Sequence, residues 1–411
     1  MTAPAAVSGH IRALTGLRAV AALLVVGAHA AFWTGRYTND LAGTALSRLE
    51  IGVPVFFALS GFLLFRPWLA AAAGGQALPS TRTYLWHRAR RILPAYWIVV
   101  AATYVIYLFR DDAGETGRGW PGFWRNMTLT QIYGPGHLHD GLTQTWSLAV
   151  EVTFYLLLPV IGWVLVVGVC RRRWHPVRLA AALSVLVAVT PLWTLITHHT
   201  DITFTARLWL PGFVAWFAGG MLLALASVTI RHCNPYVAGL LALYFLLLAC
   251  TPLAGEATIV PLDATDAVVK SMLFLLFAVS LMAPLVIGDR PGPFGRLCAS
   301  TPMVWLGEIS YELFLVHLVV MAFVLDMLGY RTFQGSTVGV FVVTTVFSIP
   351  VAWALHRTLL RVVPDGPRAG MFALGVQRPG NVSTTCGVDE FVQVGSARSP
   401  GGEAAVGKGA H

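Results

Sequence analysis

The 411-residue chain has few charged residues. Only 11% of its residues are Asp, Glu, Lys or Arg, whereas 56% are hydrophobic, and ordinary soluble domains carry roughly 25% charged residues. This deficit excludes a conventional water-soluble enzyme. The five cysteines are scattered without a CxxC pair, so the sequence predicts neither a disulfide framework nor a structural zinc site.

The sequence also lacks the short motifs of several soluble enzyme classes. It contains no GxxxxGK[ST], GxSxG or HExxH pattern, which leaves phosphate-loop, serine-hydrolase and zincin chemistry without support. No internal repeat is visible at a fixed period. That absence weighs against a secondary transporter or flippase, which is the main alternative function, because such proteins are often built from repeats.

Long apolar segments are what the chain does contain. About ten of them approach the roughly 20 residues that a helix needs to cross a bilayer. We therefore expect an all-α fold, a polytopic transmembrane helical bundle of about ten helices with the lipid bilayer as its solvent. The expected helices lie near residues 13–32, 50–69, 92–109, 145–169, 179–197, 207–228, 235–253, 268–288, 303–327 and 336–358.

Positive charge is distributed unevenly over the loops between these segments. With the N-terminus inside, the cytoplasmic loops hold about twice as many basic residues as the outer loops. We expect a multi-pass protein of the cell inner (plasma) membrane with both termini in the cytoplasm. The net charge of +9 then suits an anionic leaflet, and we expect no nucleic-acid partner.

The composition changes near the C-terminus. Residues 364–411 are rich in Gly, Pro, Ser and Ala, and such a segment buries too little apolar surface to offset the entropy of ordering. We expect one membrane domain, residues 1–363, followed by a disordered cytoplasmic tail, residues 364–411. Any chemistry must then lie within the helices and short loops of the membrane domain.

Ionisable residues inside apolar helices are the first candidates for a functional site, because a charge in lipid is costly unless it is paired or faces a cavity. Arg18 and His29 share the first expected helix. Their separation comes to about 20° past three full turns and about 16 Å along the axis, so both side chains are expected on one face. A snorkelling arginine and a packed histidine explain this pair equally well when it is taken alone.

Two further groups of candidates lie at the start of the third expected helix and within the fourth. Arg88 and Arg91 belong to a basic run, which often only anchors topology, although guanidinium groups also bind phosphate oxygens bidentately. Glu151 is a lone carboxylate in an apolar helix. It needs a cationic or hydrogen-bonding partner, and His29 or one of the arginines is the natural candidate.

Other polar residues carry weaker signals. His317 lies about 140° around the ninth expected helix from Glu312, so the two are not expected to share a face, and a structural and a functional role for His317 remain equally open. Two outer-loop segments, 137–140 and 198–201, contain metal-like residue types. Two or three such ligands in a loop have low specificity, so we predict no metal site.

Five sequence segments, in this order, resemble the acyltransferase-3 family of bacterial membrane O-acyltransferases. They are LTGLRAVAALLVVGAHA, GVPVFFALSGFLL, RARRILPAYW, TWSLAVEVTFYLLLPV and LGEISYELFLVH. The resemblance implies about ten helices, an acyl-CoA donor carrying an acetyl or longer group, and transfer to a hydroxyl. The implied acceptors are a sugar, a glycan, a lipid-linked sugar or a macrolide-type natural product.

By position, the resemblance matches Arg18 and His29 to the family's essential Arg and His, Arg88 and Arg91 to its basic motif, and Glu151 to its carboxylate after Trp-Ser. We expect His29 and Glu151 to be catalytic and Arg18, Arg88 and Arg91 to bind acyl-CoA. His29 acts either as a general base or as a carrier of the acyl group, and both routes stay open at this stage. Glu151 is expected to orient its ring, in the manner of the third member of a triad.

Some positions depart from the commonest family pattern. Pro54 stands where many members have Asp, Val152 where a second Glu often follows, and Glu308 where a basic residue is frequent. Ser147 and Tyr155 are left out of the catalytic set, because a buried hydroxyl usually bonds to a helix carbonyl.

Overall fold

The computed structural model describes residues 11–73, 77–110, 114–259, 261–288 and 292–362, and the expected tail 364–411 lies outside these ranges. The described part is helical and contains no β-strand, which confirms the all-α fold. Its longer helices are α1 (Ile11–Trp33), α3 (Gly52–Ala72), α4 (Thr81–Tyr107), α6 (Thr145–Trp163), α7 (Pro176–His199), α8 (Val214–Thr229), α9 (Pro235–Ala249), α10 (Ala264–Val286), α13 (Ser310–Met327) and α14 (Thr337–Val362).

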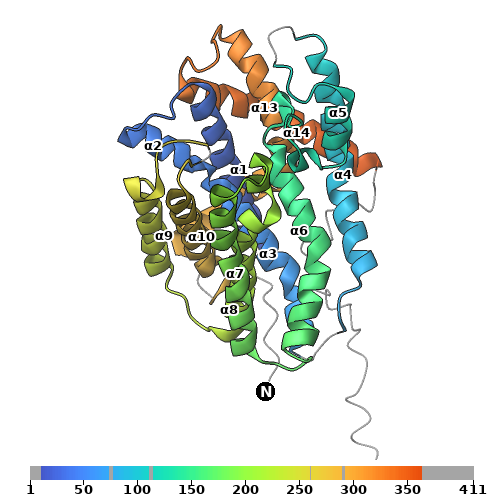
Figure 1. The fold of residues 1–411 in the computed structure, drawn as a ribbon, viewed down its shortest axis with the longest axis vertical. Helices are drawn as coiled ribbons and strands as arrows, with labels where there is room; N and C mark the ends of the chain where they lie inside the picture. The colour runs from blue at the N-terminus through green and yellow to red at the C-terminus, as the bar shows by residue number, and fades with distance from the viewer. Residues whose placement is uncertain (1–10, 74–76, 111–113, 260, 289–291, 363–411) are drawn as a thin grey trace, which may run out of the picture. The chain divides into compact units, whose positions relative to one another are not determined.

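Shorter helices connect these elements. They are α2 (Leu41–Ser47), α5 (Trp120–Met127), α11 (Gly292–Cys298) and α12 (Thr301–Glu308), and a π-helical turn, Val164–Val169, extends α6. The long helices lie side by side, as Figure 1 shows.

The long helices have the size and surface of membrane-spanning segments. Among the described residues, eight helices are long and apolar enough to cross a membrane, whereas α8 and α9 are shorter, with 16 and 15 residues. Leu192 of α7, Leu240 of α9 and Val346 of α14 are each more than half exposed. Apolar outward faces on such helices suit lipid and not water. The protein is a multi-pass membrane protein.

The structure differs from the expected helices at three places. Helix α4 begins at Thr81 and not near residue 92, because Ser80 caps it by accepting a hydrogen bond from the backbone N–H of Thr83. Residues 110–143, which lie between the third and fourth expected helices, contain α5. The expected helix 303–327 divides at Ile309 into α12 and α13.

Helices α3 and α8 pack closely through glycine. Gly61 of α3 faces the carbonyl oxygen of Phe217, and a Cβ atom there would collide with it. Gly220 of α8 faces the carbonyl oxygen of Ala58 in the same way. Small residues at such positions let helix backbones approach in a membrane protein, where apolar burial alone does not drive association.

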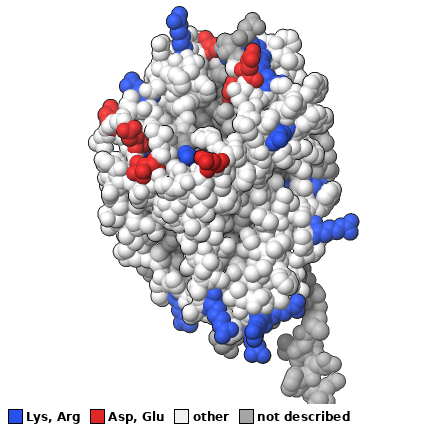
Figure 2. Space-filling view, in the orientation of Figure 1, with Lys and Arg blue, Asp and Glu red and all other residues white. Residues whose placement is uncertain are grey.

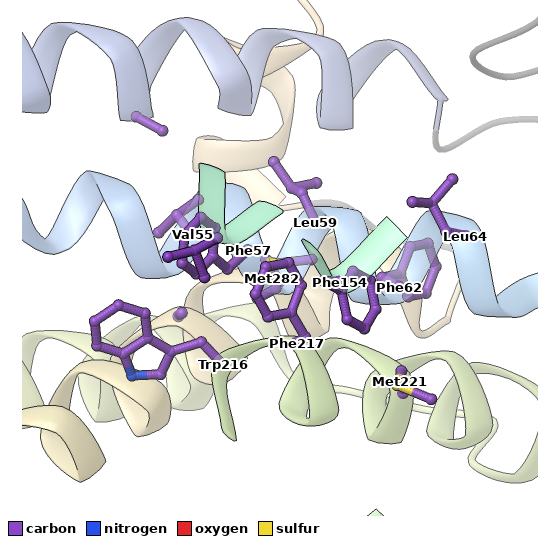
Figure 3. Packing of buried hydrophobic residues seen from close by; sticks show 14 of the residues in the cluster. Val55, Phe57, Leu59, Phe62, Leu64, Phe154, Trp216, Phe217, Met221 and Met282 are labelled. Carbon is purple, nitrogen blue, oxygen red and sulfur yellow. The ribbon is translucent and has the colours of Figure 1, made fainter. Parts of the chain in front are cut away.

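Aromatic rings extend this contact to α6. The ring of Phe217 stacks on Phe57 of α3, with ring centroids 4.4 Å apart, and on Phe154 of α6, at 4.0 Å (Figure 3). The three rings hold α3 and α6 against α8. These two helices carry polar residues of the candidate site, so the aromatic core positions that site.

Leucine in place of Gly220 is expected to prevent assembly of the bundle, because its side chain has no room against the backbone of Ala58. The measurement is the yield of monodisperse protein on gel filtration in detergent, together with its Tm. Gly239→Leu on α9 is the matched control, since no neighbouring side chain or other helix of the described structure lies within 4 Å of a Cβ at that position. Equal yield and Tm for both variants would contradict a close α3–α8 contact.

Candidate active site

A narrow cavity of about 80 Å³ lies among helices α1, α3, α4, α6 and α13. Its lining includes Arg18 of α1, Arg88 and Arg91 of α4, and Glu151 and Tyr155 of α6. Four of the five site residues expected from the sequence therefore meet at one place. Helix packing brings them together from three helices, and the cavity combines cationic groups with a carboxylate in an otherwise apolar bundle.

Glu151 is held by hydroxyl groups. It accepts hydrogen bonds from Ser60 of α3 and from Tyr155, one turn further along α6, and these two hydroxyl oxygens lie 3.3 Å apart. Arg18 and Arg91 lie within electrostatic range of the same carboxylate. Glu151 thus has both the donors and the cationic neighbours that a carboxylate requires in lipid.

The two hydroxyl residues considered in α6 behave differently. Ser147 donates to the carbonyl oxygen of Gln144 at 3.1 Å, as expected of a buried helical hydroxyl. Tyr155 donates to Glu151 instead. The sequence does not single out Ser60, because nothing within α3 indicates that its hydroxyl faces a carboxylate of another helix.

Arg88 and Arg91 form a compact cationic site on α4. Arg88 is only 7% exposed, and its Nε atom has no hydrogen-bond partner among the described residues. Arg91 lies three residues further on, which places it on the same helix face, and both residues line the cavity. Buried guanidinium N–H groups are costly to leave unpaired, and two adjacent guanidinium groups match the oxygens of a phosphate.

His29 lies outside the residues that line this cavity. Its Nδ1 atom is 2.9 Å from the carbonyl oxygen of Val25 and 3.2 Å from Nε2 of His317 on α13. The centroids of the two imidazole rings are 5.0 Å apart. The sequence left the role of His317 open, because spacing along one helix cannot show which residue of another helix it meets.

Glu151 and His29 do not bond to each other in the described structure. The carboxylate bonds to hydroxyl groups and the imidazole to a carbonyl and to His317, so the expected orienting contact is absent from this arrangement. Phe314 lies between the cavity and the two imidazole rings. Its side chain lines the cavity, and its ring centroid lies 6.0 Å from that of His317.

The remaining polar residues of α13 have their own partners. Glu312 is buried and bonds to His356 of α14, with Oε1 and Nδ1 2.7 Å apart. Glu312 and His317 therefore face different neighbours, as their angular separation predicts.

His139, one of the outer-loop histidines singled out above, is a packed residue. Its Nδ1 accepts a hydrogen bond from the backbone N–H of Gly141 at 3.1 Å, and its ring contacts Tyr104 and Tyr107. Burial, with a smaller contribution from Arg118, lowers its pKa from 6.5 to about 4. The imidazole is therefore neutral at physiological pH. The described residues contain no group of three or more His, Cys, Asp or Glu placed to hold a metal ion.

A family model described as an acyltransferase domain, that of the acyltransferase-3 family, matches residues 11–357. The chain belongs to the acyltransferase-3 family. The matched range contains every helix that contributes to the cavity and both members of the imidazole pair. Membership of the acyltransferase-3 family makes the protein an enzyme that transfers acyl groups, and not a transporter without chemistry.

Curated relatives agree with this assignment. Acyltransferase MdmB of Streptomyces mycarofaciens is 28% identical over 345 residues, which cover 80% of this chain and 82% of that protein. Putative peptidoglycan O-acetyltransferase YrhL of Bacillus subtilis is 32% identical over 190 residues, 43% of this chain and 27% of that protein. Nodulation protein 10 of Rhizobium leguminosarum bv. viciae is 29% identical over 218 residues, 48% of this chain and 53% of that protein. No solved structure matches the chain.

Proposed function

We propose that this enzyme is a membrane-embedded O-acyltransferase that moves an acyl group from acyl-CoA to a hydroxyl of a sugar, a glycan or a glycosylated natural product. The observation that carries the proposal is the cavity in which Arg18, Arg88, Arg91 and Glu151 meet. One relative is named a putative peptidoglycan O-acetyltransferase and another an acyltransferase. The first name supports transfer to a hydroxyl oxygen, and the second supports acyl transfer.

The donor is acetyl-CoA or a longer acyl-CoA, bound by its phosphates. Arg88 and Arg91 supply adjacent guanidinium groups for phosphate oxygens, and Arg18 adds a third cation at the same cavity. The thioester end then extends along α1, where His29 lies about 16 Å further on. Phe314, which contacts both the cavity and His317, lies on this route.

His29 is the proposed catalytic residue. As a general base it takes the proton of the acceptor hydroxyl while the oxygen attacks the thioester carbonyl. The C–O bond forms, the C–S bond breaks, and the departing thiolate takes up the proton. In the alternative route the imidazole itself carries the acyl group between donor and acceptor. Glu151 contributes from the cavity, by balancing the charge of the arginines.

We place the protein in the cell inner membrane with both termini in the cytoplasm. On the face shown in Figure 2, acidic side chains lie only in the upper half, whereas basic ones lie in both halves and are the only charged side chains at the lower end. Such segregation agrees with a cytoplasmic basic end under the positive-inside rule. This orientation presents the arginine cavity to cytoplasmic acyl-CoA.

The test is thiol release by the purified protein from acetyl-CoA and longer acyl-CoAs, with glycan, lipid-linked sugar and macrolide acceptors. We expect release that depends on both donor and acceptor, with one acylated product for each free thiol. Detergent-solubilised protein suffices, because a pure transporter cannot consume acyl-CoA in the absence of a membrane. Acyl transfer from other donors only, with no use of any acyl-CoA, would overturn the proposed donor.

A further inference from the structure

The tautomers of the two imidazole rings follow from their carbonyl neighbours. Nδ1 of His29 lies 2.9 Å from the carbonyl oxygen of Val25, and Nδ1 of His317 lies 2.7 Å from that of Phe314. A carbonyl oxygen only accepts hydrogen bonds. Each Nδ1 atom must therefore carry a proton, and in the neutral rings each Nε2 atom has a lone pair.

These tautomers give the contact between the rings a direction. Nε2 of His317 lies 3.2 Å from Nδ1 of His29. The proton on Nδ1 of His29 is thus shared between the carbonyl oxygen of Val25 and the lone pair of His317. Nε2 of His29 makes no hydrogen bond with the described residues, so its lone pair is the one left for chemistry.

Burial separates the roles of the two rings. His317 has no exposed surface, whereas His29 is partly exposed. A substrate can therefore reach His29, with His317 behind it. No carboxylate of the described residues bonds to either ring, because Glu151 bonds to Ser60 and Tyr155 and Glu312 bonds to His356.

We propose that His317 is a positioning residue that holds the ring of His29 and shares its proton during the reaction. The inference rests on the proposed function, in which His29 is the base. When Nε2 of His29 accepts the hydroxyl proton, the ring becomes a cation and its Nδ1–H becomes a stronger donor. Nε2 of His317 accepts that stronger bond, which is the part a carboxylate plays in a Ser-His-Asp triad.

Two replacements of His317 distinguish its two proposed roles, which are to hold the ring of His29 and to share the proton of that ring. Glutamine places an amide oxygen near the position of Nε2, where it can accept from Nδ1 of His29 but cannot take up a proton. Leucine removes the acceptor altogether. His198→Gln is the matched control, because Nδ1 of His198 lies 2.8 Å from the carbonyl oxygen of Thr194, one helical turn back, and its Nε2 lies 3.5 Å from the carbonyl oxygen of Pro261 instead of a second imidazole.

The measurement is kcat and the KM for acyl-CoA, from thiol release with a saturating acceptor, together with the Tm of each variant. We expect His317→Leu to lower kcat about 100-fold, at the lower end of general-base effects. We expect His317→Gln to lower it only about 10-fold, because glutamine keeps the hydrogen-bond acceptor and loses only the ability to take up a proton. The KM for acyl-CoA should stay within about twofold of wild type, because the phosphates bind elsewhere. His198→Gln should match wild type.

Different failures have different meanings. Wild-type kcat in a folded His317→Leu protein would overturn the inference, and wild-type kcat in His317→Gln would overturn proton sharing. If the leucine variant does not fold, the glutamine variant decides alone. An inactive His29→Ala protein beside a fully active His317→Leu protein would remove only this inference. An active His29→Ala protein would remove His29 from the proposed function as well.

Discussion

Alanine in place of His29 is expected to lower acceptor-dependent thiol release at least about 1,000-fold, within the range that a general base contributes. The replacement removes Nε2 of His29, the nitrogen whose lone pair can accept a proton. Its lone pair is available because the ring's proton lies on Nδ1, which contacts Val25 and His317. His317 cannot substitute, because it is fully buried. The measurement is kcat/KM from thiol release, with the acylated product identified by mass spectrometry.

His198→Ala is the control for this experiment, since it removes an imidazole with the same bond to a carbonyl one turn back on another helix. We expect it to keep wild-type activity and a similar Tm. Equal rates for the two variants would show that His29 is not catalytic. An acyl label trapped on wild type and lost in His29→Ala would select the carrier route over the general-base route.

The second large effect is expected at Arg88. Glutamine there should raise the KM for acyl-CoA about 10- to 100-fold, because a charge-assisted hydrogen bond contributes about 1.5–3 kcal/mol. The buried guanidinium has no partner at Nε among the described residues, so its proposed partner is the donor's phosphate. An acyl-pantetheine thioester, which lacks the phosphates, should show nearly the same rate constant with both proteins.

Arg90→Gln is the matched control, because Arg90 stacks over Trp86, 5.8 Å from the ring centroid, and lies outside the residues that line the cavity. It should leave the KM for acyl-CoA unchanged. If Arg88→Gln lowered the rate with acyl-pantetheine as much as the rate with acyl-CoA, Arg88 would stabilise the helical bundle and would not bind the phosphates.

Hydropathy predicted the helices well but not all of their ends. Lipid offers no hydrogen bonds to the backbone, so long apolar segments must be helical, and this constraint is visible in the sequence. Helix α4 begins eleven residues before the expected position (92 against 81). Its first turns are polar and start at a serine cap, so they add nothing to an apolar signal.

The sequence predicted which residues form the candidate site, but it did not predict which side chains contact one another. Arg18 and Glu151 stood out because ionisable residues are rare in apolar helices, and the structure brings both to one cavity. Glu151 and His29 were expected to bond to each other. Instead, Glu151 bonds to Ser60 and His29 bonds to His317. Neither of these partners carries a signal within its own helix.

The sequence by itself determined that this protein is an all-α membrane enzyme, because long apolar helices and rare buried charges are properties of single segments. It also determined the family, through short contiguous motifs that can be recognised without any contact between helices. Only the tertiary structure decided which side chains meet. Contacts between helices depend on how far each helix is rotated and how closely glycine lets the backbones approach, and the periodicity of one helix records neither.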